Sequence, residues 1–272
     1  MPPPHTIKPL LLLMLTTLLP ARAGAAPEWQ QTVSGEKTTL TALARVNKDP
    51  KLFTQGLVID SGWLYESSGG YGRSKVCKTP LPLASLDKRQ SYCQNLNASL
   101  FAEGITLYRQ HLFRLSWRSG ELAVYNSRNL SIIKTIPYRG QGWGLTHNNQ
   151  HFIMSDGSYR LYFRNLDSFA LEGHVDVTWQ GRKIKNLNEL QWIEGQIWAN
   201  QWHSNLIYII EPKSGVVLET LDFSHLAPQL QHRDPDAVLN GIAYDNASRQ
   251  LVITGKRWPY YFRFQLNRRA SQ

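Results

Sequence analysis

The chain has 272 residues, of which 42% are hydrophobic and 18% are charged, and its formal net charge is +10. A chain of this length and composition can bury a core in one or two domains. The basic residues are scattered, and their densest cluster (Arg182, Lys183, Lys185) is short and lacks regularly spaced aromatic partners, so nucleic acid is not an expected partner.

Residues 1–23 have the pattern of a secretory signal peptide. A weakly basic start with His5 and Lys8 precedes a short apolar run, and Ala21-Arg22-Ala23 has the small-x-small pattern of a cleavage site. About ten apolar residues fall short of the ~20 that span a bilayer, although an uncleaved anchor is the alternative. We expect an exported protein, periplasmic or secreted, that has no membrane contact after cleavage and is poorly ordered over residues 24–37.

Residues 38–46, TTLTALARV, alternate weakly between apolar and polar side chains and are expected to form a strand. One pattern then recurs along the chain, as TQGLVI at 54, AEGITL at 102, GWGLTH at 142, LNELQW at 187 and LNGIAY at 239. Each copy precedes a turn and a second run rich in Tyr, Ile, Val, Phe and Trp, which is strand composition. A period of roughly 40 to 50 residues with several strands per unit predicts a β-propeller.

The five copies lie within residues 50–266, so we expect an all-β protein whose residues 38–272 form a single five-bladed β-propeller domain. The strand at 38–46 would supply the outer strand of the last blade and close the ring. A β-sandwich with chance regularity is the alternative.

Cys77 and Cys93 are the two cysteines of the chain. They are close in sequence and would reach an oxidising compartment, which predicts a disulfide between them. They have no nearby histidines, so a zinc site is not expected.

The second position of each repeated motif, here called the slot, carries a polar or aromatic residue. The inner strands of a propeller begin at one end of the ring, the mouth, so their slots should meet there. The slots hold Gln55, Glu103, Trp143, Asn188 (followed by Glu189) and Asn240. A second set is expected where the next strand turns: Glu66, Trp117, Asp156, Trp202 and Lys256. This mixture is typical of an apolar pocket with a few placed polar groups.

Ten short motifs then occur in the order found in one enzyme family. They are FTQGL, LYESSGGYGRS, FAEGIT, LSW, GWGLT, MSDGS, LNEL, ANQW, LNGIAYD and TGKRWP. The sequence resembles the glutaminyl-peptide cyclotransferases of plants and bacteria over residues 39–266. Ala102, Ser116 and Gln191 depart from the usual residues of that family, and none of these positions has an assigned role.

The resemblance implies a five-bladed propeller that converts an N-terminal glutamine to pyroglutamate and releases ammonia. It implies an acyltransferase whose substrates are peptides and proteins with N-terminal Gln, and N-terminal Glu more slowly. We expect a monomer.

Glu103 is the candidate proton shuttle. The α-amine of the substrate must be neutral to attack, and the leaving group must receive a proton. Phe101, Trp117 and Trp143 would desolvate Glu103 and raise its pKa. Pairing of Glu103 with an arginine is the structural alternative, and Glu189 is a competing carboxylate that spacing alone does not exclude. The resemblance favours Glu103.

Substrate capture is assigned to side chains that bind a neutral carboxamide and amine. Gln55 and Asn188 can donate and accept hydrogen bonds, and Glu189 would help to hold the substrate. The aromatic residues Phe53, Phe101, Trp117, Trp143 and Trp202 would form the walls.

Lys256 lies at an apolar strand end, where a lysine is costly without a partner or a function. It either pairs with Glu189, Glu66 or Asp156, or it stabilises the developing oxyanion together with an indole N–H.

No metal ligand is predicted, and catalysis should require no cofactor; a structural cation could still bind backbone carbonyls in the central channel.

Two other functions stay open. One is a calcium-dependent lactonase that uses Glu103, Asn188, Asn240 and Asp156. The other is a propeller that only binds peptides.

Overall fold

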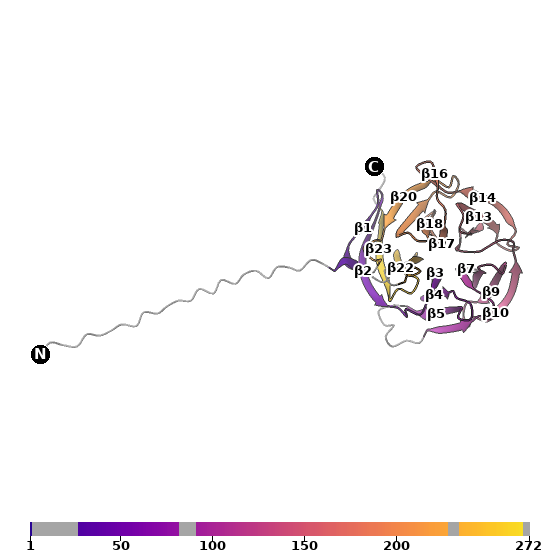
Figure 1. The fold of residues 1–272 in the computed structure, drawn as a ribbon, viewed down its shortest axis with the longest axis horizontal. Helices are drawn as coiled ribbons and strands as arrows, with labels where there is room; N and C mark the ends of the chain where they lie inside the picture. Colours follow the sequence, from indigo (N-terminus) through magenta and orange to yellow (C-terminus); the bar gives the residue numbers. More distant parts are fainter. Residues whose placement is uncertain (2–26, 82–90, 228–233, 269–272) are drawn as a thin grey trace.

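The computed structural model describes residues 1, 27–81, 91–227 and 234–268 of the chain. Five antiparallel sheets surround a central axis (Figure 1). In four of them the strands follow one another in the sequence, and the fifth joins strands from both ends of the described chain. This arrangement confirms the predicted all-β, five-bladed propeller. Most of the predicted signal peptide falls on residues 2–26 and lies outside the described residues.

The first three blades follow in chain order. Blade 1 consists of β3 (Thr54–Asp60), β4 (Trp63–Ser68), β5 (Lys75–Pro80) and β6 (Tyr92–Asn95). Blade 2 consists of β7 (Ala102–Tyr108), β8 (His111–Ser116), β9 (Glu121–Asn126) and β10 (Ile132–Pro137). Blade 3 consists of β11 (Leu145–His147), β12 (His151–Ser155), β13 (Arg160–Asn165) and β14 (Leu171–Asp176).

A small hairpin separates blade 3 from the last two blades. It is formed by β15 (Thr178–Trp179) and β16 (Arg182–Lys183). Blade 4 consists of β17 (Leu187–Ile193), β18 (Gln196–Gln201), β19 (Leu206–Ile210) and β20 (Val217–Asp222). Blade 5 consists of β21 (Leu239–Asp245), β22 (Gln250–Gly255), β23 (Tyr260–Arg268) and the N-terminal strands β2 (Thr38–Asn47) and β1 (Val33–Ser34).

Strand β2 closes the ring. It pairs with β23 in antiparallel fashion from Thr38 opposite Arg268 to Asn47 opposite Tyr260, so the predicted closure of the last blade by the N-terminal strand is confirmed. The sequence predicts little order for residues 24–37. In the structure, residues 27–37 contain a 3₁₀ turn, η1 (Glu28–Gln30), and strand β1, which pairs with β2.

The core lies in the interfaces between neighbouring blades. Successive side chains of a strand point to opposite faces of its sheet, and both faces of a blade are covered by its neighbours. In β18, for example, Ile197 packs into the cluster shared with blade 3, whereas Trp198 packs into the cluster shared with blade 5. This double burial explains the nearly continuous apolar composition of the second strands.

The disulfide between Cys77 and Cys93 is formed, as predicted, and it joins directly opposed residues of β5 and β6. Within the described ranges, no helix has the length and hydropathy required to cross a bilayer.

Candidate active site

The inner strands meet as a closed ring. Strand β3 contacts β7 and β21, and β17 contacts β11 and β21, while β7 contacts β11. The third position of the repeated motif, directly after the slot, explains this close approach. A Cβ atom on Gly56 or Gly104 would lie 2.5 Å from the backbone nitrogen of Ile105 or Leu145 in the next inner strand, and one on Gly144 would meet the carbonyl of Asn188.

In four inner strands the slot coincides with a break in strand pairing. The register between the first and second strands shifts between Thr54 and Gly56, and equivalent shifts occur in β7, β17 and β21. Such bulges redirect side chains and are common beside active sites. The bulges therefore explain how polar residues at the start of apolar strands can point toward the mouth of the ring.

Glu103 is buried, with 5% of its surface exposed. Its carboxylate forms no hydrogen bond or ion pair with any residue that the structure describes, so the arginine partner considered above is absent there. Burial raises the pKa of Glu103 well above its ordinary value, and the nearby charge of Lys256 opposes that rise. The protonated form of Glu103 is therefore favoured relative to an exposed glutamate.

Lys256 is buried and begins the turn after β22. Burial lowers its pKa to about 8, while Glu103 and, more weakly, Asp236 act to raise it. Its Nζ lies 5.1 Å from the ring centre of Phe53. Among the described residues it forms no ion pair with Glu189, Glu66 or Asp156, so the scaffold pairings proposed for it are not found.

Glu189 occupies the position that is glycine in the other four motifs, and its carboxylate binds backbone groups. Its Oε1 accepts a hydrogen bond from the Leu57 N–H at 3.3 Å, and its Oε2 accepts one from the Ile242 N–H at 2.9 Å. Burial raises its pKa, and both backbone hydrogen bonds act against that rise. The side chain therefore links three inner strands: β17, β3 and β21.

Three buried amide oxygens near the mouth have no hydrogen-bond partner among the described residues: Gln55 Oε1, Asn188 Oδ1 and Asn240 Oδ1. The amide nitrogen of Asn240 donates to the Thr54 carbonyl at 2.9 Å. An unsatisfied buried acceptor costs about 1–3 kcal/mol. These oxygens are therefore available to accept hydrogen bonds from a bound donor.

Aromatic side chains from four blades form a wall around the mouth. The ring of Phe101 lies 6.4 Å from that of Phe53 and 5.4 Å from that of Trp117, and Trp143 lies 5.7 Å from Trp202. The structure therefore brings together the five aromatic residues predicted for the pocket.

Gln141 joins the two halves of this wall and was missed by the sequence analysis. Its Oε1 accepts hydrogen bonds from the indole N–H of Trp117 at 2.9 Å and from that of Trp143 at 3.3 Å. The side chain is exposed and lies in a loop between blades, so strand patterns give no signal for it. Only its position directly before the GWGLT motif could have drawn attention to it.

The prediction that Glu66 faces the mouth is wrong. Its carboxylate accepts hydrogen bonds from Thr54 Oγ1 at 2.5 Å and from the Tyr261 hydroxyl, and it lies 3.6 Å from Lys48 Nζ. Glu66 is in the middle of β4, opposite Leu57. The residue that corresponds to Trp117 in blade 1 is Gly69, because both donate their backbone N–H to the residue two positions before the slot.

Lys48, directly after the closing strand β2, connects the buried Glu66 carboxylate to the segments that carry Phe53 and Lys256. Its Nζ donates to the carbonyls of Leu52 at 3.2 Å and Gly255 at 3.4 Å. These carbonyls immediately precede Phe53 and Lys256 in the chain. The carboxylate of Asp156 accepts hydrogen bonds from the Ser158 N–H and the Tyr162 hydroxyl.

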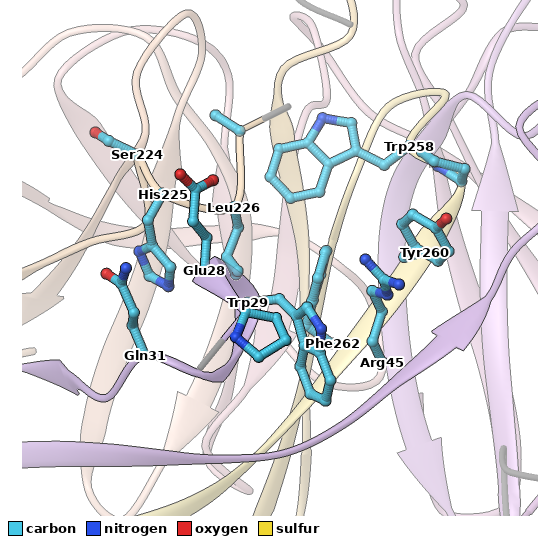
Figure 2. Close-up of a pocket in the computed structure, with 13 residues that line it drawn as sticks. Glu28, Trp29, Gln31, Arg45, Ser224, His225, Leu226, Trp258, Tyr260 and Phe262 are labelled. Carbon is cyan, nitrogen blue, oxygen red and sulfur yellow. The ribbon is translucent and has the colours of Figure 1, made fainter. Parts of the chain in front are cut away.

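A cavity of about 750 Å³ lies elsewhere, between η1, the segment after β20 and the start of β23 (Figure 2). Arg45 lies between the rings of Trp29 and Tyr260, at 5.6 and 4.4 Å from their centres. None of the predicted site residues lines this cavity. Within the described residues, no group of three or more His, Cys, Asp or Glu side chains could hold a metal ion.

Comparisons with known proteins agree on one family. The sequence matches the glutamine cyclotransferase family over residues 12–266. It is 34% identical over 238 residues to a glutaminyl-peptide cyclotransferase of Arabidopsis thaliana, which covers 86% of this chain and 73% of that protein. The crystal structure of Myxococcus xanthus glutaminyl cyclase matches with a TM-score of 0.76 and 32% identity, over 85% of this chain and 97% of that one.

Replacing Gln141 should release both indoles from their shared acceptor. In Gln141→Leu we expect the indole N–H signals of Trp117 and Trp143 to shift in ¹H–¹⁵N NMR spectra and to exchange faster with solvent, because each loses a hydrogen bond worth about 1 kcal/mol. Gln141→Glu keeps an acceptor and should preserve both signals. Gln150→Leu, at another exposed glutamine, is the matched control. Unchanged indole signals in Gln141→Leu would contradict the assignment.

Proposed function

Because the chain belongs to the glutamine cyclotransferase family and is a glutaminyl-peptide cyclotransferase, we propose that Glu103 moves the proton when an N-terminal glutamine closes to pyroglutamate. The observation that carries this assignment is a buried carboxylate that has no hydrogen-bond partner among the described residues and has a raised pKa. The comparisons do not favour the lactonase or the purely peptide-binding alternative.

The reaction forms one bond and breaks another within a single residue. The α-amine nitrogen attacks the side-chain carboxamide carbon, and the resulting tetrahedral intermediate expels the carboxamide nitrogen as ammonia. A free α-amine has a pKa of about 7.7–8.0, so a modest base suffices to take its proton. Ionised Glu103 accepts that proton and returns it to the leaving nitrogen, as general base and then general acid. The overall step is an acyl transfer from one nitrogen to another.

The unpartnered amide oxygens of Gln55 and Asn188 support a role in substrate capture. The amine and the carboxamide NH₂ of the substrate are hydrogen-bond donors that would satisfy them. The aromatic wall excludes water from the folded-back side chain and orients it for attack, which lowers the entropic cost of cyclisation. Glu189 receives a bracing role in this proposal, since both of its oxygens bind backbone N–H groups.

Lys256 is proposed to stabilise the oxyanion of the tetrahedral intermediate. It is the cation whose charge acts most directly on Glu103. An indole N–H is a second donor. Those of Trp117 and Trp143 are already bound to Gln141, whereas that of Trp202 has no hydrogen-bond partner among the described residues. We therefore propose the indole N–H of Trp202 as the second hydrogen-bond donor to the oxyanion.

Substrates with N-terminal Glu, which lack the amide leaving group, are proposed to react slowly, and the protein to act as a monomer after export. Size-exclusion chromatography with light scattering tests the oligomeric state. N-terminal sequencing of exported material tests whether residues 1–23 are removed.

Glu103→Gln tests the chemical assignment. The substitution preserves size but cannot carry the proton, so kcat for ammonia release from a Gln-peptide should fall by at least about a hundredfold. Circular dichroism should show an intact fold, because the described residues offer Glu103 no ion pair to lose. Near-normal turnover in a folded Glu103→Gln protein, with turnover lost in Glu189→Gln, would move the role to Glu189.

The pH profile tests Lys256. If its charge is required, activity should fall as pH rises through its pKa of about 8. Arginine stays charged above pH 12, so the alkaline limb of Lys256→Arg should move upward. Lys256→Met removes the charge that lowers the pKa of Glu103, so the acid limb of the pH–activity profile of this variant should move to higher pH. An alkaline limb that is identical in wild type and Lys256→Arg would contradict the role.

Catalysis is proposed to be independent of metal, since no step described above needs a Lewis acid. Cyclisation of a Gln-peptide should persist in EDTA as long as circular dichroism reports a folded protein. Activity that is lost with the fold intact, and restored by added metal, would mean that Glu103 is a ligand rather than a base.

A further inference from the structure

Three of four neighbouring loops at the mouth carry an arginine, and none of the four carries Asp or Glu. In a meander of antiparallel strands, alternate connections lie at the same end of the blade. The four such loops between β4 and β11 span residues 69–74, 96–101, 117–120 and 138–144, and the acidic residues Asp49 and Asp156 lie outside them, before β3 and after β12. The four loops contain three arginines and neither Asp nor Glu. We call Arg73, Arg118 and Arg139 the basic rim.

The arginines of the basic rim are exposed, and none forms an ion pair with a described residue. Two basic residues near blades 4 and 5 do form ion pairs. Arg257 pairs with Asp234, and Lys183 pairs with Asp176 at 2.9 Å. Arg182 and Lys185, between β14 and β17, are exposed and also form no ion pair with a described residue, so the basic rim is the part of this unpaired positive charge that lies beside blades 1 to 3.

The basic rim is fixed to the aromatic wall of the pocket. The guanidinium of Arg118 lies 3.9 Å from the ring centre of Trp117. Tyr71, in the same turn as Arg73, is 53% exposed, and its ring lies 5.4 Å from that of Phe101.

Backbone hydrogen bonds bring the third arginine to the same place. The Tyr138 N–H donates to the Gly120 carbonyl, and the Gly142 N–H donates to the Trp117 carbonyl. The loop that carries Arg139 therefore runs along the loop that carries Arg118.

We propose that the basic rim binds acidic side chains in the residues that follow the N-terminal glutamine, so that the enzyme prefers substrates with Asp or Glu at positions 2 to 4. The inference rests on the proposed function, which places the glutamine inside the aromatic wall. Each following residue extends the chain by about 3.3–3.6 Å, so positions 2 to 4 must pass the loops of the mouth. Guanidinium groups without partners bind carboxylates in bidentate geometry.

The test compares kcat/KM for three peptides, Gln-Ala-Glu-Glu, Gln-Ala-Ala-Ala and Gln-Ala-Lys-Lys, with the full chain. Alanine at position 2 keeps the surroundings of the reacting amine alike. Each exposed ion pair is worth up to about fivefold, so the acidic peptide should exceed the basic one by about tenfold in 0.01 M salt. In 1 M salt, where the Debye length is about 3 Å, the ratio should fall below about twofold.

A charge-matched pair of variants separates the basic rim from the net charge of the protein. Arg73→Glu/Arg139→Glu should reverse the ratio of acidic to basic peptide. Arg128→Glu/Lys134→Glu changes the net charge equally at exposed positions, in the turn between β9 and β10 and on β10, and should keep most of the ratio.

Three results would overturn the inference. They are a wild-type ratio within twofold of one, a ratio that does not respond to salt, and an equal loss of the ratio in both variants. The salt series uses the wild-type protein and therefore decides the matter even if a variant does not fold. Failure to convert any of the three peptides would overturn the proposed function itself.

Discussion

The contact between neighbouring inner strands is the constraint on which the rest of the molecule depends. At Gly56, Gly104 and Gly144 the next strand lies where a side chain would begin. This contact sets how tightly the five blades close around the axis. Because the glycine leaves no room for a side chain of its own, the preceding residue is the one that can enter the mouth, and in blade 2 that residue is Glu103.

Two buried carboxylates in equivalent blades have different surroundings, and the roles that we propose for them differ accordingly. Glu189 occupies the position that is glycine in the other motifs, and each of its carboxylate oxygens accepts one hydrogen bond, from the N–H of Leu57 or of Ile242. Glu103 stands one position earlier in its motif and has a hydrophobic environment with one nearby cation. Burial raises both pKa values, but only the Glu103 carboxylate accepts no hydrogen bond from the described residues. Environment, and not residue type, separates the two roles.

The sequence was sufficient for the architecture because each blade repeats the same strand pattern, and for most of the pocket because the slot repeats with it. It was insufficient where backbone pairing decides the outcome. The sequence analysis placed Glu66 at the mouth because it aligned the second strands of the blades by their apolar runs. The backbone hydrogen bonds instead align Gly69, three residues later, with Trp117 of blade 2. The role of Gln141 could not be predicted from the sequence because its two hydrogen-bond partners, Trp117 and Trp143, belong to different blades.

The pairing of β2 with β23 has a consequence for the order of events during biosynthesis. Asn47 pairs with Tyr260, so β2, which is synthesised before every strand of blades 1 to 4, keeps one edge unpaired until β23, the last strand, is made. Contacts of such large sequence separation form late, because a long loop must close before they can form. Lys48 extends from that same strand to the carbonyls before Phe53 and Lys256. Nascent chains therefore lack the assembled pocket, and competence to act on other proteins' N-termini arises only when the whole ring has formed.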